Sequence, residues 1–319
     1  MAGRFSNALR LCAVSVDLDE IGCYSAIHGL PELPEPASHA VYRRALPRLL
    51  ELFGTMSIPA TLFACGRDLT DATAAQALRA AAADGYEIGN HSFDHLYDLS
   101  RRSPAEIRTQ VLEGSRAIES ATGQKPVGFR APGYTINDAM FDVLAELDVT
   151  YDSSVFPCPA YYAAKALAIG HYLARGRQTH SVVDDPRVLR APAEPYRVDR
   201  PFYREGKGVL ELPIGVTRDF TGRLPFIGTY IVVAGTRGAR LLTRLIAGRS
   251  LVNLELHGID AADAHDDGLE ALIVPQQPDL RVRARDKLKN LRTALEALRE
   301  QGYQFVTLRD AARIFGAVV

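Results

Sequence analysis

Short runs of apolar and β-branched residues alternate along this chain with segments of helical periodicity, and this alternation restricts the fold more than any other feature. The runs at 11–16 (LCAVSV), 59–64 (PATLFA) and 251–256 (LVNLEL) are typical of buried strands. Residues 72–83 and 285–301 instead have the composition and spacing of helices. Regular alternation of strand and helix predicts an α/β protein with a parallel sheet.

The middle of the chain contains one well-marked helix start and one irregular stretch. We expect a helix from Pro104 to Ala121, because Ser103 can cap its first turn and Glu106 can complete a capping box. Between 157 and 208 the pattern is lost among many Pro, Gly, Tyr and Arg residues, and we expect a long insertion or loops around a pocket. The remaining expected elements are helices at 40–53 and 138–147 and strands at 85–89, 127–130, 149–151, 209–213 and 305–308. Because α/β barrels of this length commonly form one domain, residues 1–319 are expected to be a single domain.

Charge and cysteine content narrow the class of protein. The 37 basic residues balance 38 acidic ones, so we expect no nucleic-acid partner. The four cysteines, Cys12, Cys23, Cys65 and Cys158, form no CxxC pair and are expected to be reduced thiols. Neither a secretory signal pattern nor an apolar stretch of about 18 residues is found in the sequence. We therefore expect a cytoplasmic protein, with the inner membrane surface as the alternative location.

Polar side chains of the kinds used in catalysis stand at or just beyond the carboxyl end of five expected strands. The segments are VDLD at 16–19, HSFDH at 91–95, RAPGY at 130–134, YDSS at 151–154 and LELH at 254–257. The active sites of α/β barrels are built from the carboxyl ends of their strands. We therefore expect these five segments to form one site.

The first two segments can hold a metal ion. His91 and His95 can bind one cation if their segment forms a helical turn, although such a pair is also compatible with surface or packing histidines. Strand alternation sends Asp17 and Asp19 to the same face, and neighbouring carboxylates are rarely buried without a cation or a shared proton. A metal held by Asp19, His91 and His95 leaves positions for water and substrate, and Asp17 is then free to act as a general base. The alternative is that either aspartate caps a following turn.

Two further side chains, Arg130 and His257, are assigned catalytic roles only because the candidate metal ligands and Asp17 accompany them. Arg130 can hold a catalytic carboxylate through two parallel hydrogen bonds, but taken alone it is also compatible with a surface ion pair. His257 can donate a proton to a leaving amine, whereas a lone histidine after a strand is often structural.

Taken in order, the five segments resemble the motifs of the NodB-type polysaccharide deacetylase family, carbohydrate esterase family four. They stand here as SVDLDE, NHSFDH, FRAPGY, YDSS and LELH. The resemblance implies a distorted (β/α)7 TIM-like barrel, the NodB homology domain, with a divalent metal for which Zn²⁺ is the expectation. It also implies a role for each matching position. The roles are base for Asp17, metal ligands for Asp19, His91 and His95, acid for His257, orientation of Asp17 by Arg130 and of His257 by Asp152, and the oxyanion and substrate side for Gly133 and Tyr134.

The expected reaction is metal-dependent removal of an acetyl or formyl group from the nitrogen of an amino sugar, either a small molecule or lipid-linked. The VDLD form of the first motif is similar to the intracellular branches of the family, and the lack of tryptophan departs from the family's usual fourth motif. FRAPGY with the later ELPIGV is similar to the branch that deformylates lipid-linked aminoarabinose. Two alternatives are a cytosolic amidase of the same fold acting on a non-sugar amide and a catalytically silent sugar-binding module. The apolar and basic segments at 160–177 and 237–249 favour either peripheral membrane contact or ordinary packing on the barrel.

Overall fold

A curled and mostly parallel sheet forms the centre of the molecule in a computed structural model, which describes residues 9–31, 37–176, 179–269 and 273–319. The strands are β1 (Leu11–Asp17), β2 (Ala60–Ala64), β3 (Glu87–Asn90), β4 (Gly128–Phe129), β5 (Tyr151–Asp152), β6 (Tyr196–Val198), β7 (Glu205–Glu211), β8 (Leu251–His257) and β9 (Gln304–Val306). Their order is β6-β7-β5-β4-β3-β2-β1-β8, and β9 also pairs with β1. Only the β6–β7 pair is antiparallel among the described pairs.

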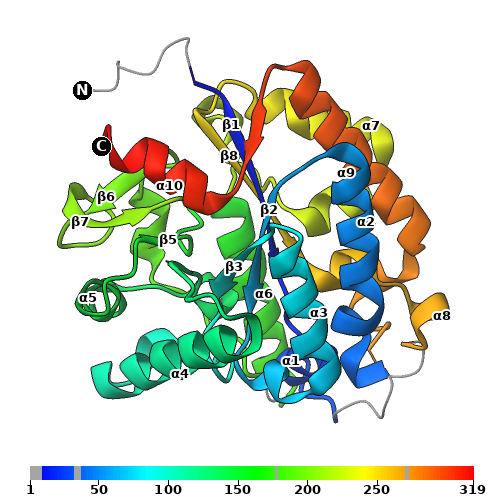
Figure 1. The fold of residues 1–319 in the computed structure, drawn as a ribbon. Helices are drawn as coiled ribbons and strands as arrows, with labels where there is room; N and C mark the ends of the chain where they lie inside the picture. Colours follow the sequence, from blue (N-terminus) through cyan, green and yellow to red (C-terminus); the bar gives the residue numbers. More distant parts are fainter. Residues whose placement is uncertain (1–8, 32–36, 177–178, 270–272) are drawn as a thin grey trace.

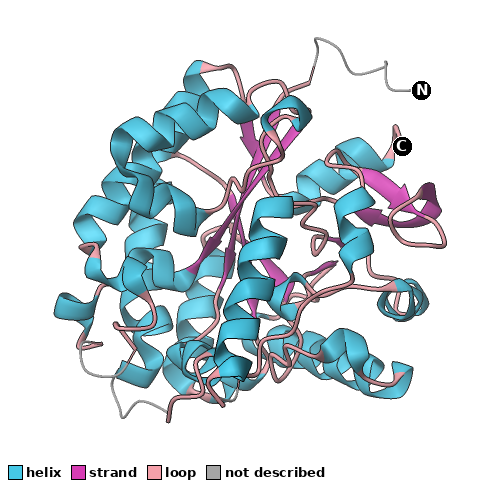
Figure 2. Ribbon diagram, turned by 180° about the vertical axis from the view of Figure 1, so that it is seen from behind, coloured by secondary structure: helices cyan, strands magenta, loops and turns pink. Residues whose placement is uncertain are grey.

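The sheet curls until its two ends approach each other. The chain that leaves β7 reaches β8, where the Gly215 N–H donates to the Asn253 carbonyl at 2.8 Å. Figure 2 shows the strands enclosed by helices, with the β6–β7 hairpin at the periphery. This architecture confirms the expected distorted (β/α)7 TIM-like barrel.

Helices follow most of the strands and cover the outside of the sheet (Figure 1). They are α1 (Ile21–Ile27), α2 (Leu46–Met56), α3 (Ala72–Ala83), α4 (Pro104–Thr122), α5 (Asp138–Glu146), α6 (Pro159–Ala174), α7 (Gly228–Ile246), α8 (Ala264–Asp267), α9 (Ala284–Glu300) and α10 (Leu308–Gly316). The α4 start is the expected capping box, in which the Ser103 hydroxyl accepts from the Glu106 N–H and the Glu106 carboxylate accepts from the Ser103 N–H. None of the described helices is long and apolar enough to span a bilayer.

The alternation of side chains along β1 divides the core and places the site. Cys12, Val14 and Val16 pack among the outer helices, whereas Leu11 and Ala13 pack with α10. All seven residues of β1 are buried, because both faces of a parallel barrel strand are covered. In Figure 1, α10 lies near the end where β1 begins, and α1 lies beyond its carboxyl end. The apolar residues of α10 fill the barrel at the amino end of β1. The polar side chains of the candidate site therefore lie at the carboxyl end of the strand.

Two expectations need correction. The stretch 157–208 is not only loop, because it contains the sixteen-residue helix α6 and the short strand β6. The last expected strand, 305–308, ends at Val306, and Leu308 begins helix α10 instead. The burial of Leu308 and Phe315 against Leu11 explains this ending, since the apolar face of α10 closes the barrel interior. The four cysteines are free thiols, as expected.

Candidate active site

The strand register brings the candidate acid and base side by side. Asp17 is the last residue of β1 and is paired with His257, the last residue of β8. His91 directly follows β3, and Arg130 directly follows β4. Asp152 of the YDSS segment ends β5, which runs parallel to β4. All five segments therefore lie at one edge of the curled sheet, as expected from the sequence.

Asp19, His91 and His95 converge on one point. The distances are 3.2 Å from Asp19 Oδ1 to His91 Nε2 and 3.2 Å from Asp19 Oδ2 to His95 Nε2. All three side chains are buried, and both Nε2 atoms have no hydrogen-bond partner within the described part of the chain. Buried polar atoms without partners are costly unless a ligand satisfies them. A carboxylate and two imidazoles are suited to a divalent cation such as Zn²⁺, so these residues fit the implied metal.

Hydrogen bonds and charges prepare these side chains for a cation. His91 Nδ1 lies 2.7 Å from the Arg130 carbonyl, which can only accept, so Nδ1 carries a proton and Nε2 is the ring atom that faces Asp19. Burial alone would raise the pKa of Asp19, but the imidazoles of His95 and His91 hold it well below its ordinary value. The triad therefore presents an ionised carboxylate beside a ring nitrogen able to bind metal.

The HSFDH segment is not the helical turn that the i, i+4 spacing suggested. Ser92 and His95 have positive φ angles of 68° and 54°, so the backbone bends twice through the left-handed region. Side chains hold this bend, because Asn90 Oδ1 accepts from the Ser92 N–H at 3.0 Å and Ser92 Oγ accepts from the His95 N–H at 3.2 Å. Helix α4 approaches so closely that a Cβ on Gly114 would lie 2.5 Å from Asn90 Oδ1. The two imidazoles still meet, but through a turn stabilised by its surroundings.

Arg130 lies fully buried beneath the candidate base. Its Nη1 donates to Asp17 Oδ1 at 2.7 Å, a single hydrogen bond instead of the two parallel ones expected. The remaining donors bond to Ser15 Oγ and to the carbonyl and hydroxyl of Ser153, and the guanidinium stacks 4.3 Å from the Phe63 ring centroid. The second carboxylate oxygen, Asp17 Oδ2, accepts no hydrogen bond from Arg130 among those described, and it lies 3.8 Å from His91 Nε2. One oxygen is thus held and the other faces the metal ligands.

His257 is held by a carboxylate that the sequence reasoning missed. Its Nδ1 lies 3.0 Å from Glu255 Oε1, and its Nε2 lies 3.2 Å from the Tyr134 hydroxyl. Asp152, expected to orient His257, instead accepts from the N–H and hydroxyl of Ser154. The expected contact is not found among the described residues, where the side-chain partners of Asp152 are Ser154 and Glu211. The signal was available in LELH, since residues two apart on a strand share a face.

Comparison with known proteins shows which family part of this chain matches. Residues 39–151 match the polysaccharide deacetylase family. A peptidoglycan deacetylase of Helicobacter pylori is 26% identical over 147 residues, which cover 46% of this chain and 49% of the relative. A chitooligosaccharide deacetylase of a Bradyrhizobium species is 40% identical over 87 residues, which cover 27% and 38% of the two chains.

Residues 39–151 belong to a polysaccharide deacetylase domain. The alignments of the chain span about half, or less, of the length of these curated relatives. The matched range holds the HSFDH and RAPGY segments, and the fold supplies Asp17, Asp19 and His257 from outside it. No specific similarity to the aminoarabinose branch emerges from these relatives.

Solved structures agree on the fold of this deacetylase domain. A Mycobacterium smegmatis protein assigned to the polysaccharide deacetylases superposes with a TM-score of 0.57 at 19% identity, covering 97% of this chain and 92% of its own. A pseudoenzyme of carbohydrate esterase family four from Bacillus anthracis superposes with a TM-score of 0.51 at 14% identity, covering 95% and 66%. Since a pseudoenzyme shares the fold, activity has to be argued from the side chains.

The RAPGY segment of the deacetylase domain forms a tight turn beside His257. Gly133 and Tyr134 both have positive φ angles, 60° and 61°. A Cβ on Gly133 would also lie 3.0 Å from the ring of Tyr97. Lys165 of α6 donates to the Gly133 carbonyl at 2.9 Å, and Ser154 Oγ accepts from the Ala131 N–H at 2.8 Å. The turn is therefore fixed where the resemblance puts the oxyanion side, and that role stays a prediction.

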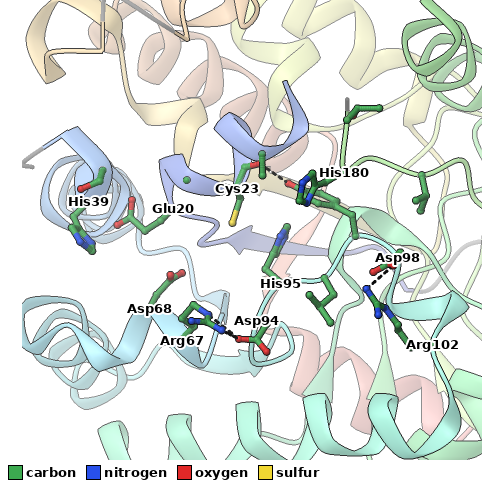
Figure 3. Close-up of a pocket in the computed structure, with 17 residues that line it drawn as sticks. Glu20, Cys23, His39, Arg67, Asp68, Asp94, His95, Asp98, Arg102 and His180 are labelled. Atoms are coloured by element: carbon green, nitrogen blue, oxygen red, sulfur yellow. Dashed lines mark hydrogen bonds and ion pairs between the residues drawn. The ribbon is translucent and has the colours of Figure 1, made fainter. Parts of the chain in front are cut away.

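A cavity of about 940 Å³ borders the candidate metal ligands Asp19, His91 and His95 at His95 (Figure 3). Ion pairs between Arg67 and Asp94 and between Arg102 and Asp98 lie around it. Its other lining residues are Glu20, Gly22, Cys23, Ala26, Ser38, His39, Asp68, Leu96, Tyr97, Thr179, His180 and Val182. The last three belong to the irregular stretch after α6, so part of the region expected to surround a pocket does so.

Proposed function

We propose that this chain is a divalent-metal-dependent hydrolase that removes the N-acyl group of an amino sugar. The observation that carries the proposal is the meeting of three metal-ligand candidates with an arginine-held carboxylate, Asp17, and a carboxylate-held imidazole, His257. The named relatives, which act on peptidoglycan or chitooligosaccharides, support an acetylated amino sugar as the substrate class.

Each buried group has a place in such a hydrolysis. A divalent cation held by Asp19, His91 and His95 supplies Lewis acidity to the acyl carbonyl and to water. Asp17 accepts the proton of the attacking water on Oδ2, because Arg130 occupies Oδ1. His257 delivers a proton from Nε2 to the departing nitrogen, and Tyr134, 3.2 Å from that atom, lies beside the path. The products are a free amine and a carboxylic acid.

The test compares substrates and metals with matched variants. Acetate and formate release would be followed from N-acetyl- and N-formyl-glucosamine, from chitooligosaccharides and from a non-sugar amide, after chelation and reloading with Zn²⁺. We expect activity on N-acyl amino sugars to need added metal and to fall roughly 10³-fold in Asp17→Asn. Asp286→Asn, at an exposed position of α9, is the control and should keep wild-type turnover. Undiminished turnover in Asp17→Asn would remove Asp17 from the role of base.

The same panel separates the alternatives. Hydrolysis of only the non-sugar amide would favour an amidase of the same fold, and metal binding without any turnover would favour a silent sugar-binding module. The intact set of base, ligands and acid supports the enzyme over the silent module. The ratio of acetate to formate release identifies the acyl group.

We also propose a cytoplasmic location with peripheral contact at the inner membrane. The free cysteines support the compartment. Helix α6 has no fully buried residue, and its Leu167 and Leu173 are 75% and 63% exposed. Exposed apolar side chains of this kind are suited to a lipid surface. Helix α7 adds Leu241, which is 54% exposed. Arg177, the last residue of the apolar and basic segment expected at 160–177, lies outside the described residues.

Vesicle flotation tests the membrane proposal. With vesicles of phosphatidylglycerol and phosphatidylcholine, we expect wild-type protein to float and the double variant Leu167→Gln, Leu173→Gln to stay in solution. Wild-type protein that does not float with these vesicles would rule out the proposed membrane contact.

A further inference from the structure

We propose that Glu255 is the positioning residue for His257, holding its imidazole so that Nε2 faces the departing nitrogen. The inference rests on the proposed function, because it assigns a partner to the acid of that reaction. It replaces Asp152, which the sequence resemblance had put in this place.

The backbone of β8 sets up the contact. Residues 255 and 257 are two apart on a strand, so both side chains lie on the face that β1 meets with Ser15 and Asp17. Glu255 is completely buried, and its Oε1 lies 3.0 Å from His257 Nδ1. Within the described part of the chain, neither oxygen of Glu255 and not the Nδ1 atom of His257 has a hydrogen-bond partner, so the two groups meet as an ion pair. A buried carboxylate without other partners is costly, and the imidazole is what compensates it here.

The chemistry of a carboxylate at Nδ1 is directional. It favours the tautomer with the proton on Nδ1 and stabilises the imidazolium that has to form before a proton is donated from Nε2. Burial opposes this by lowering the pKa of His257, but the carboxylate of Glu255, followed by those of Asp19, Asp17 and Asp260, raises it to about 9. A cation bound to Asp19 would offset the charge of that aspartate. The ring would then depend on Glu255 as its directly contacting carboxylate.

Other charged and titratable groups face the pair, and none of them takes the place of Glu255. Asp260 accepts from the backbone N–H of His257 at 2.9 Å, not from the ring. Asp17 is committed to Arg130, and the Tyr24 ring meets the imidazole edge to face at 6.3 Å. The nearest groups on the surrounding elements are Asp17, Asp19, Tyr24, Arg130, Tyr134 and Asp260.

Glu211 of β7 offers a matched control. It is as completely buried as Glu255, but its neighbour is the carboxyl group of Asp152. Burial and the adjacent Asp152 raise the pKa of Glu211 well above its ordinary value, so a neutral amide is a close replacement. Its Oε1 accepts from the Val155 N–H at 3.0 Å, a bond that glutamine can keep.

The experiment uses the full chain loaded with Zn²⁺ and the variants Glu255→Gln, Glu255→Asp and Glu211→Gln. Two readouts are compared: the pH profile of kcat and KM, and the imidazole titration of His257 followed by ¹⁵N NMR, with His257→Asn to assign the signal. For Glu255→Gln we expect kcat to fall roughly 10²-fold with KM nearly unchanged, since only the proton donor is affected. Its alkaline limb and the midpoint of the His257 titration should both move to lower pH. Glu255→Asp should restore part of the rate and of the titration, and Glu211→Gln should match the wild type.

An unchanged tautomer and titration of His257 in Glu255→Gln would overturn the inference, as would an equal loss of kcat in Glu211→Gln. Should the glutamine variant fail to fold, a His257 midpoint in Glu255→Asp between those of wild type and free histidine supports the inference, and a midpoint equal to wild type overturns it. The titration is read without any substrate. A protein that hydrolyses no N-acyl substrate but shows the shifted midpoint would thus refute the proposed function and leave the Glu255–His257 pair standing.

Discussion

Arg130 shows how much of the site depends on single buried charges. Its guanidinium group donates four hydrogen bonds, to Asp17, Ser15 and Ser153, and it is fully inaccessible to solvent. Arg130→Met would leave the buried Asp17 carboxylate without its counter-charge, which we expect to cost about 3–5 kcal/mol in the free energy of unfolding. Urea denaturation measures this. Arg116→Met, which removes an exposed ion pair with Glu113, is the control and should change stability by less than about 1 kcal/mol.

The metal ligands give a second prediction at this scale. A cation that binds only the folded protein stabilises it by RT ln(1 + [L]/Kd), about 2.7 kcal/mol at a hundredfold excess over Kd. We therefore expect Zn²⁺ to raise the Tm of the chelated wild-type protein and to leave that of Asp19→Ala unchanged. Thermal unfolding with and without Zn²⁺ provides the measurement. An equal rise in both proteins would place the bound ion elsewhere.

Sequence reasoning grouped side chains whose chemistry is determined by residue type and spacing, and the metal-binding role that it gave them stays a prediction. Asp19, His91 and His95 were recognisable because few other roles bring a carboxylate and two imidazoles to strand ends. Glu255 was missed because a glutamate between two leucines of a strand has no metal or nucleophile signature. Its role depends on which neighbour it meets inside the barrel, and Asp152 was misassigned for the same reason.

Contact between elements controls the metal ligands as well. Gly114 lets α4 approach the HSFDH turn, and a Cβ there would lie 2.5 Å from Asn90 Oδ1 and 2.8 Å from the Ser92 carbonyl carbon. We expect Gly114→Ala to destabilise the protein by about 1–3 kcal/mol and to weaken Zn²⁺ binding, because the turn has to move. Gly54→Ala in α2 meets no atom within 4 Å and should stabilise by roughly 0.5–1 kcal/mol. Denaturation and Zn²⁺ titration of the two variants test this, and Zn²⁺ affinity equal to wild type in Gly114→Ala would contradict it.

Elements with strong local signals were predictable, and those defined by tertiary contact were not. The 72–83 helix and the capping box at Ser103 were found because propensity and capping are local. The HSFDH turn depends on hydrogen bonds from Asn90 and Ser92, which no periodicity reveals. Helix α10 forms where its apolar face fills the barrel end, so the apolar run at 305–308 was extended too far as a strand.

At the scale of the whole molecule, the described residues include more buried acidic than buried basic side chains. Burial raises the pKa of several carboxyl groups inside the barrel: Glu20, Asp68, Glu87, Asp152, Asp184 and Glu211. Asp68, in the cavity beside His95, is the clearest case. Burial, with Glu20 and Asp19 nearby, raises its pKa to about 8. Its Oδ2 is buried without a hydrogen-bond partner among the described residues.

These shifts predict an unusual pH dependence of stability for the metal-free protein. Between about pH 4, the unfolded pKa of a carboxyl group, and pH 8, the folded state binds more protons than the unfolded state. The stabilisation is complete below that unfolded pKa and is lost as pH rises through the folded value, so Tm should fall from pH 5 to pH 8.5. The lowered pKa of Asp19 acts in the opposite direction and only in acid, where stability falls as its carboxylate is protonated. Asp68→Asn, which cannot ionise, should show a smaller fall in Tm across the same range. A Tm that rises toward pH 8.5 in the chelated wild type would contradict the prediction, because it would show that these carboxyl groups are ionised in the folded state.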